Sequence, residues 1–300
     1  METTKYIWLN GQFVLWEDAK IHIVSHSLHY GSAVFEGIRA YKTPNGGAIF
    51  RLKEHIDRLF YSADALGFKI PYTKEEVMTA TKELLKKNDI EACYIRPLVH
   101  YGYGVMSVFP QGAPVDVSIS CWPWGAYLPH DMVDVKIVSL IKLSPRAVVA
   151  DAKVAGHYVN GMLAAKELQG TKYHEGLLLD EHGFLAEGPG ENVFIVKDGK
   201  LLTPKLGNIL AGITRDTVIQ LANDWGIAVE EREILPEDAF KADEAFYSGT
   251  AAEITPIRSI DDHILGAGKI GPITTKFKEG FSEITSGKNP KYQKWLAYVN

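Results

Sequence analysis

The sequence predicts an α/β protein of two domains, and three observations support this prediction. The chain has 300 residues, which suggests two domains at ~150 residues per domain. Strand-like apolar runs alternate with amphipathic helical stretches in both halves. Residues 121–130 combine prolines, a glycine and large aromatic side chains, as is typical of an interdomain linker. We therefore expect a smaller N-terminal α/β domain over 1–122, a linker over 123–134 that lines a cleft, and a larger C-terminal domain over 135–300.

The composition is typical of a globular protein whose partners are small molecules. The net charge is -5 and the basic residues are scattered, which argues against nucleic acid or an anionic membrane as a partner. The N-terminus shows no secretory signal, and no apolar run reaches the ~18 residues of a membrane span. Two cysteines, Cys93 and Cys121, form no disulfide framework. We therefore expect a cytoplasmic protein.

The N-terminal half is predicted to contain a hairpin, further strands and two helices. Apolar runs flank Asn10-Gly11, a strong hairpin signal. Residues 34–41 are predicted to form a strand with Phe35, Gly37 and Arg39 on one face. Arg39 beside aromatic residues suits a carboxylate, and an ordinary arginine on an edge strand is the alternative. The other predicted elements are helices over 52–66 and 73–87 and strands over 91–100 and 115–121. Arg58 on the first helix is expected to be solvated.

Three histidines, His22, His26 and His29, lie close together in the sequence and raise the question of a metal site. No cysteine or aspartate accompanies them within that stretch, so we do not expect one. Residues 101–111 are rich in glycine and aromatic residues, which suits a binding loop.

Lys153 is the candidate catalytic residue of the chain. Its neighbours are small or apolar apart from Asp151, so the ammonium form is expected to be poorly solvated and its pKa lowered. A neutral lysine amine can form a Schiff base with a carbonyl. The alternative is a lysine that reaches solvent at a helix start. The helix that follows carries Tyr158, Met162 and Ala165 on one face and stops at Gly170.

The C-terminal half offers an acidic turn and two backbone sites that suit an anion. Residues 176–204 are predicted to form a meander whose second turn, 187–192, carries two carboxylates and an amide. An ordinary polar turn is the alternative. Gly212, Ile213 and Thr214 open a helix whose N-terminus suits a phosphate, although Thr214 could also be a plain N-cap. Residues 248–252 follow a strand and could form an anion nest or a tight turn. A strand over 254–260 and a helix from near Pro272 complete the chain.

These features together match the needs of pyridoxal phosphate. That cofactor requires a lysine for a Schiff base, an acid partner for its pyridine nitrogen and a phosphate cup. An amino-acid substrate would add a carboxylate site.

The sequence also resembles the class IV, fold-type IV pyridoxal-phosphate aminotransferases, and most closely the bacterial branched-chain amino acid aminotransferases. The matching runs follow in the same order over nearly the whole chain. They are S-H-S-L-H-Y-G-S-A-V-F-E-G-I-R at 25–39, H-I-D-R-L at 55–59, Y-I-R-P-L at 94–98, P-W-G-A-Y at 123–127, A-K-V-A-G-H-Y at 152–158, E-G-P-G-E-N at 187–192, G-I-T-R-D at 212–216 and S-G-T-A-A-E-I-T-P at 248–256. The resemblance implies the fold-type IV architecture, with a pseudo-barrel in the C-terminal domain.

The resemblance also implies residue roles. Lys153 would carry pyridoxal 5'-phosphate and move the proton, and Glu187 would hold the pyridine nitrogen protonated. The other implied cofactor-binding residues are Arg58, Tyr158, Asn192, Gly212, Ile213, Thr214, Gly249 and Thr250. The implied substrate-binding residues are Tyr30, Phe35, Gly37, Arg39, Tyr94, Arg96, Trp124, Tyr127, Thr250 and Ala251. Some of them would come from the partner subunit of a homodimer, and a hexamer is the alternative assembly.

The activity implied is ping-pong transamination of leucine, isoleucine and valine with 2-oxoglutarate, which gives 2-oxo acids and L-glutamate. The Tyr101–Pro110 loop departs from the enterobacterial pattern and leaves the donor and acceptor range open. The alternatives within the fold are D-amino acid or amine aminotransferases and aminodeoxychorismate lyase, and the F-E-G-I-R run at 35–39 favours L-amino acids. A Schiff-base aldolase would normally use a βα barrel, which the predicted meander contradicts. A non-catalytic cofactor-binding protein would leave the coexistence of Lys153 and Glu187 unexplained.

Overall fold

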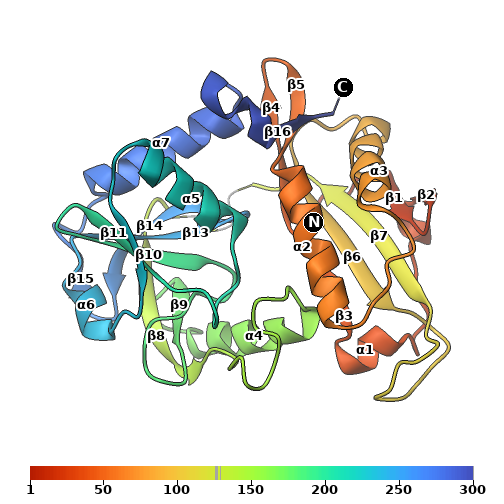
Figure 1. The fold of residues 1–300 in the computed structure, drawn as a ribbon, viewed down its shortest axis with the longest axis horizontal. Helices are drawn as coiled ribbons and strands as arrows, with labels where there is room; N and C mark the ends of the chain where they lie inside the picture. Colours follow the sequence, from red (N-terminus) through yellow and green to blue (C-terminus); the bar gives the residue numbers. More distant parts are fainter. Residues whose placement is uncertain (126–127, 129, 300) are drawn as a thin grey trace. The chain divides into compact units, whose positions relative to one another are not determined.

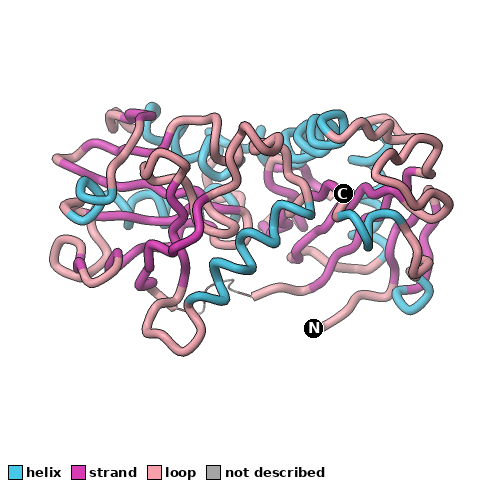
Figure 2. Tube along the Cα trace, turned by 90° about the horizontal axis from the view of Figure 1, so that it is seen from below, coloured by secondary structure: helices cyan, strands magenta, loops and turns pink. Residues whose placement is uncertain are grey.

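The computed structural model describes residues 1–125, 128 and 130–299 of the chain. It forms two compact units, each mixing strands with helices (Figures 1 and 2). Unit 1 contains Met1–Gly125, Ala152–Gly156 and Glu283–Asn300, and unit 2 contains Ala126–Asp151 and His157–Ser282. Lys153 therefore belongs to unit 1, in a short segment that lies between two parts of unit 2 in the sequence. The mixed α/β class predicted from the sequence is confirmed. Among the described residues, none of the helices has both the length and the apolar character needed to cross a membrane.

Unit 1 is built on one sheet and its covering helices. Its strands are β1 (Tyr6–Leu9), β2 (Gln12–Leu15), β3 (Ala33–Phe35), β4 (Ile38–Thr43), β5 (Gly46–Phe50), β6 (Cys93–Tyr101), β7 (Val115–Trp122) and β16 (Leu296–Tyr298). Its helices are α1 (His26–Tyr30), α2 (Leu52–Ala65) and α3 (Lys74–Lys87), with 3-10 turns at Trp16–Asp18 and Pro290–Trp295. The sheet order is β16-β5-β4-β6-β7-β1-β2, and β3 pairs with β6. The predicted hairpin at Asn10-Gly11 is confirmed, with positive φ at both residues as its turn requires.

The single strand predicted over 34–41 is wrong, because the chain forms two short strands there. Phe35 in β3 pairs with Leu98, and Ile38 in β4 pairs with Ile95. Between these pairs, Glu36 lies beside Pro97 and donates its N–H to the Pro97 carbonyl at 2.9 Å. Pro97 has no N–H to return, so the regular ladder stops at this point. The break takes Glu36 and Gly37 out of the strand alternation.

The core of unit 1 lies between this sheet and the two long helices. α3 packs on β1 and β7, and α2 packs on α3 and β3. The inward faces of α2 and α3 carry Ile56, Leu59 and Leu84, all fully buried, as their helical spacing predicts. Thr73 caps α3 in a complete capping box with Glu76. Ala152 and Val154 are also part of this core, so Lys153 is fixed on both sides by buried neighbours.

Unit 2 is built on a second sheet. Its strands are β8 (Val133–Ile141), β9 (Glu175–Leu179), β10 (Asn192–Lys197), β11 (Lys200–Pro204), β12 (Val229–Arg232), β13 (Glu244–Gly249), β14 (Glu253–Ile260) and β15 (His263–Ile264). Its helices are α4 (Tyr158–Glu167), α5 (Ile213–Asp224), α6 (Pro236–Phe240) and most of α7 (Pro272–Thr285), and a 3-10 turn (Ala155–His157) precedes α4. The sheet order is β12-β11-β10-β13-β14-β8-β9, with β15 beside β14.

The predicted meander over 176–204 is correct only in part. β10 and β11 form an antiparallel hairpin around Asp198-Gly199, as predicted. β9 instead pairs in parallel with β8, because the α4 crossover connects them. Residues 184–187 make only isolated bridges, at Leu185 and Glu187. The segment that carries Glu187 is therefore irregular rather than a strand of the meander.

Two packing details shape the helices of unit 2. α4 buries Gly161 and Ala164, whereas Met162 is 69% exposed, so the predicted face of Met162 is not the buried one. A Cβ on Gly161 would lie 3.1 Å from Pro189, which explains why the tightest contact is at glycine. α5 and α7 are joined by aromatic contacts, with Phe277 packed against Trp225 and Phe246. The predicted helix from Pro272 is confirmed.

Candidate active site

Lys153 lies in unit 1 between the sheet and α2. Its backbone N–H donates to Ser62 Oγ at 2.9 Å, and its carbonyl accepts from the Phe35 N–H at 3.2 Å. Its Nζ lies 5.0 Å from the centre of the Phe35 ring, within the range of a cation–π contact. The backbone of this residue is therefore attached to both β3 and α2.

Burial and a neighbouring cation lower the pKa of Lys153 from 10.5 to about 8. Burial has the larger influence because it removes water from the ammonium, and the Arg58 guanidinium adds repulsion. Glu36 acts in the opposite direction. A large fraction of Lys153 is therefore a neutral amine near pH 8, as the sequence predicts.

Glu36, His55 and Arg58 form a buried ionic cluster next to Lys153. The Glu36 side chain is fully buried, and its two oxygens accept from Arg58 Nε at 2.6 Å and Arg58 Nη2 at 2.9 Å. His55 Nδ1 lies 2.8 Å from the same carboxylate. These charged partners outweigh the effect of burial and hold the pKa of Glu36 well below its usual value. The expectation that Arg58 is solvated is wrong, because its side chain is only 11% exposed.

The second group in unit 1 places aromatic residues around Arg96. The Arg96 guanidinium lies 4.5 Å from the Phe35 ring and 5.3 Å from the Tyr94 ring, and its Nη2 donates to the Tyr94 hydroxyl at 3.1 Å. Arg96 Nε is buried and has no hydrogen-bond partner within the described part of the chain. Buried donors are nearly always paired in native proteins. This orphaned donor fits a site that binds an anion such as a carboxylate.

Gly37 is required at this site by close packing. A Cβ at position 37 would lie 2.0 Å from the Tyr94 hydroxyl oxygen. Trp124 packs on the other side of Tyr94, with ring centres 4.3 Å apart. The structure therefore brings Phe35, Gly37, Tyr94 and Trp124 together around Arg96, as the sequence predicts.

The remaining predicted substrate residues of unit 1 are placed differently. Arg39 donates to the backbone carbonyls of Trp124 and Gly125, both at 3.4 Å, so it supports the segment that carries Trp124. Tyr30, at the end of α1, is 45% exposed. Tyr127 lies outside the described residues.

In unit 2, Glu187 is held by three different donors. Lys142 Nζ lies 2.6 Å from its Oε1, Asn192 Nδ2 donates to its Oε2 at 2.8 Å, and the Leu210 N–H is 3.2 Å from both oxygens. Glu187 is 4% exposed. Burial disfavours the Lys142 ammonium, but the charge and hydrogen bond of Glu187 outweigh it and raise the pKa of Lys142. Tyr158 contributes to the same rise, which places this predicted cofactor residue near Lys142.

The N-terminus of α5 carries three predicted cofactor residues. Gly212 is the N-cap, so the alternative of Thr214 as the cap is wrong. Ile213 and Thr214 are buried in the first turn, where N–H groups lie outside the intrahelical ladder and face an anion favourably. A Cβ on Gly212 would lie 1.9 Å from Asn192 Oδ1. The helix start and the Glu187 cluster are therefore packed together.

The turn between β13 and β14 carries Gly249, Thr250 and Ala251, all half-buried. Ser248, which precedes them, has a fully buried hydroxyl without a hydrogen-bond partner in the residues that the structure describes. Thr255 Oγ1 donates to the Ala252 carbonyl at 2.7 Å and closes the turn. A second orphaned polar atom thus lies next to a predicted phosphate-binding segment.

The histidines and cysteines form no metal site within the described residues. His26 lies between Ser32 Oγ and the Ser107 carbonyl, 2.7 Å from each, so it anchors the 101–111 loop. Cys93 and Cys121 are free and buried.

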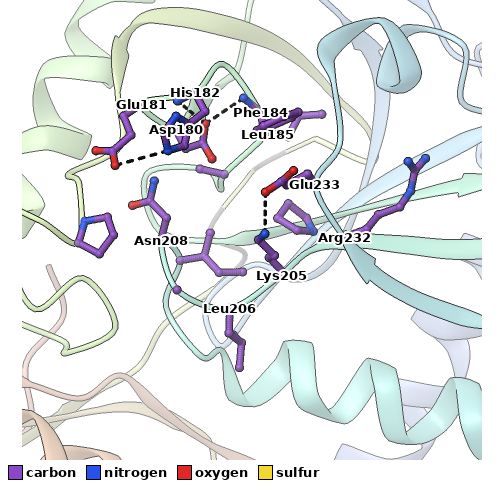
Figure 3. Close-up of a pocket in the computed structure, with 15 residues that line it drawn as sticks. Asp180, Glu181, His182, Phe184, Leu185, Lys205, Leu206, Asn208, Arg232 and Glu233 are labelled. Atoms are coloured by element: carbon purple, nitrogen blue, oxygen red, sulfur yellow. Dashed lines mark hydrogen bonds and ion pairs between the residues drawn. The ribbon is translucent and has the colours of Figure 1, made fainter.

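A further cavity of about 240 Å³ lies in unit 2 (Figure 3). Its lining includes Asp180, His182, Lys205 and Glu233 but none of the predicted site residues. Lys205 and Glu233 form an ion pair at 2.6 Å across it. This cavity is therefore a polar surface hollow rather than a continuation of the Glu187 cluster.

Comparison with known families decides the class of the protein. The family described as Amino-transferase class IV matches residues 33–260, a range that includes Lys153, Glu187 and both orphaned polar atoms. The chain belongs to the class IV aminotransferases. It is 42% identical to a branched-chain-amino-acid aminotransferase of Pseudomonas aeruginosa, over 98% of this chain and 97% of that protein. It is 43% identical to the enzyme of the same name from Escherichia coli strain K12, over 99% of both chains.

Solved structures of this aminotransferase family give the same result. The branched-chain amino acid aminotransferase from the source abbreviated T.th., complexed with N-(5'-phosphopyridoxyl)-L-glutamate, has a TM-score of 0.96 and 42% identity and covers 100% of both chains. The same enzyme with pyridoxamine 5'-phosphate has a TM-score of 0.97. The fold-type IV architecture implied by the sequence is therefore confirmed for this aminotransferase.

Sequence reasoning missed three residues of the two clusters: Glu36, His55 and Lys142. Glu36 carried a usable signal, because a carboxylate inside the apolar run V-F-E-G-I needs a buried partner. Lys142 follows the apolar end of β8 and resembles an ordinary lysine at a strand end, so the sequence alone does not distinguish it.

Proposed function

We propose that this aminotransferase transfers the amino group of leucine, isoleucine and valine to 2-oxoglutarate, with pyridoxal 5'-phosphate bound to Lys153. The names of the two relatives support the substrate class. The phosphopyridoxyl and pyridoxamine ligands named for the T.th. enzyme support the cofactor.

One observation carries the proposal, and it is the environment of Lys153. A lysine with a pKa of about 8 supplies neutral amine near neutral pH, which is the form that attacks an aldehyde and accepts a proton. Its backbone bonds to Ser62 and Phe35 fix where that amine can reach. An ordinary surface lysine has neither property.

The residues of each unit fit different parts of the cofactor. In unit 2, Glu187 is proposed to accept a hydrogen bond from the protonated pyridine nitrogen, held in place by Lys142, Asn192 and the Leu210 N–H. The cofactor, when bound, supplies a conjugated ring that accepts the electrons of the broken Cα–H bond. A carboxylate fixed by three donors suits this role, because it can keep the ring nitrogen protonated throughout.

The phosphate ester is proposed to bind to backbone N–H groups and to one arginine. In unit 2 these groups are the first turn of α5, at Ile213 and Thr214, and the turn at Gly249 and Thr250. In unit 1 the residue is Arg58. Helix N-termini, turn N–H groups and guanidinium groups are the usual partners of phosphate oxygens. Tyr158 is proposed to donate to the phenolic oxygen of the cofactor.

The substrate carboxylate is proposed to bind to Tyr94, Arg96 and the backbone of Thr250 and Ala251. The orphaned Arg96 Nε supports this assignment. Phe35, Gly37, Trp124 and Tyr127 are proposed to shape an apolar space for the branched side chain, and Tyr30 and Arg39 to support it. An apolar pocket recognises an aliphatic side chain mainly by its size.

In the proposed reaction Lys153 acts twice in each half-reaction. Its Nζ first gives up the cofactor to the incoming amino acid, and then removes the α-proton of the substrate and redelivers it. Water releases the 2-oxo acid, and 2-oxoglutarate then takes up the amino group by the reverse route to leave as L-glutamate. Both half-reactions use one site, so the kinetics are ping-pong.

We further propose that the protein is a cytoplasmic homodimer in which Tyr30 and the Tyr101–Pro110 loop contribute to the active site of the neighbouring subunit. Size-exclusion chromatography with light scattering would distinguish this assembly from a hexamer.

The test is the visible spectrum of the purified protein with pyridoxal 5'-phosphate. The yellow absorption band is expected to bleach with L-leucine and to return with 2-oxoglutarate, and Lys153→Ala is expected to abolish this cycle. A band that responds to D-alanine or to an amine but not to L-leucine would overturn the substrate class. The absence of any band after incubation with the cofactor would overturn the whole proposal.

A further inference from the structure

The buried carboxylate of Glu36 has contacts that the proposed reaction leaves unexplained. Glu36 lies at the break between β3 and β4, where its backbone bonds to Pro97, and its side chain is fully buried. An ionised carboxylate is costly to bury and is retained only with charged or hydrogen-bonding partners. Here the partners are two residues of α2, His55 and Arg58.

The geometry of the contact is bidentate. Arg58 Nε and Nη2 donate to different oxygens of Glu36, at 2.6 and 2.9 Å. Such a fork-on-fork pair fixes the plane of the guanidinium as well as its position. His55 lies on the same face of α2, one turn before Arg58, and contacts Glu36 Oε2 at 2.8 Å. Burial lowers the pKa of His55, so the neutral ring donates its Nδ1–H to the carboxylate.

We propose that Glu36 is a positioning residue that holds the Arg58 guanidinium in the orientation in which it binds the phosphate ester of the cofactor. The inference rests on the proposed role of Arg58. A free arginine side chain has many rotamers, and ordering it on ligand binding weakens affinity. Glu36 removes this cost by ordering Arg58 beforehand. Glu36 itself touches neither the phosphate nor the substrate in this scheme.

Glu36 also balances charge around Lys153. Arg58 and Glu36 act on the Lys153 amine with opposite sign, so the pair is close to neutral as seen from Lys153. A variant without the carboxylate would leave the guanidinium unbalanced next to the amine. This second effect gives a readout that a purely structural residue would not produce.

The test compares binding of pyridoxal 5'-phosphate and of pyridoxal, which lacks the phosphate, to the apoprotein. The ratio of the two dissociation constants measures recognition of the phosphate alone. Glu36→Gln is expected to reduce this ratio about tenfold or more, since it removes charge-assisted bonds to Arg58. It should also lower the pH midpoint for reaction of the Lys153 amine with pyridoxal. Glu36→Asp, a milder variant that keeps the charge, is expected to give an intermediate ratio.

Arg58→Gln and the double variant separate the inference from the proposed function. Arg58→Gln is expected to reduce the ratio at least as much as Glu36→Gln, and the double variant no further than Arg58→Gln alone. The matched control is Asp57→Asn, which removes a carboxylate of the same helix that pairs with Lys53 and Lys74 at the surface, and it should leave the ratio unchanged.

Two outcomes would contradict these expectations in different ways. If Arg58→Gln reduces the ratio while both Glu36 variants keep the original value, the positioning role is wrong and the phosphate role of Arg58 stands. If Arg58→Gln leaves the ratio unchanged, the proposed role of Arg58 itself is wrong.

Discussion

Lys142 in unit 2 and Lys153 in unit 1 are both poorly exposed to water, yet their pKa values move in opposite directions. Lys142 lies 2.6 Å from the Glu187 carboxylate, and its pKa is raised. Lys153 lies above the ring of Phe35 and is repelled by Arg58, and its pKa falls to about 8. Burial acts in the same direction on both. The nearest charged partner therefore decides whether a buried lysine stays a cation or becomes a nucleophile and base.

The comparison predicts opposite effects on stability when each lysine is removed, and the larger effect is at Lys142. Lys142→Met is expected to destabilise the apoprotein by about 3–5 kcal/mol, because Glu187 would remain buried without its cation. Urea unfolding at one fixed protein concentration measures this change. A loss below ~1 kcal/mol would show that Asn192 and the Leu210 N–H suffice to hold the carboxylate.

Lys153→Met is expected to stabilise the apoprotein by about 3 kcal/mol at pH 7. The folded pKa of about 8 is below the ordinary 10.5, so between these values the unfolded chain binds more protons and wild-type stability rises with pH. Below pH 8 both states carry the ammonium, and the folded protein bears the full cost of burying it. The advantage of the variant should therefore shrink from pH 8 to 10.5, as unfolding curves over that range would show. A constant advantage would mean that packing, not charge, is responsible.

Two glycines extend the comparison from lysines to the two halves of the site. Gly37→Ala would displace the Tyr94 hydroxyl, and Gly212→Ala would displace Asn192 from Glu187. In steady-state kinetics and cofactor titration, Gly37→Ala is expected to raise the KM for L-leucine about tenfold at unchanged cofactor affinity, and Gly212→Ala to weaken the cofactor about tenfold. The reverse pattern would contradict the assignment of substrate to Tyr94 and of cofactor to Glu187.

The smallest expected effect is at the surface carboxylate Asp57. It is 34% exposed and pairs with Lys53 and Lys74, and exposed pairs contribute little. Asp57→Asn should change the free energy of unfolding by less than ~1 kcal/mol, whereas Glu36→Gln, fully buried, should change it by more. Equal effects in thermal unfolding would remove the distinction between the two carboxylates.

The sequence predicted those parts of the site that short segments determine. Lys153 among small residues, the acidic turn with Glu187 and the helix start at Gly212 are all local patterns, and the structure places each in its expected element. Glu36 and Arg58 are far apart in sequence, and their pairing depends on the break that Pro97 causes on the neighbouring strand. Lys142 meets Glu187 only because the α4 crossover brings β9 beside β8 in parallel. Such long-range pairings leave no local pattern, which is also why the predicted meander was partly wrong.

The most direct test of this account is the pKa of Lys153 in the apoprotein. Lysine amines can be labelled by reductive methylation with ¹³C-formaldehyde and followed by NMR as a function of pH, with Lys153→Met to assign the signal. The account predicts one signal with a midpoint near pH 8 that is absent from the variant, while the Lys142 signal shows no midpoint below pH 10. A Lys153 signal that titrates near 10.5, like an ordinary lysine, would contradict it.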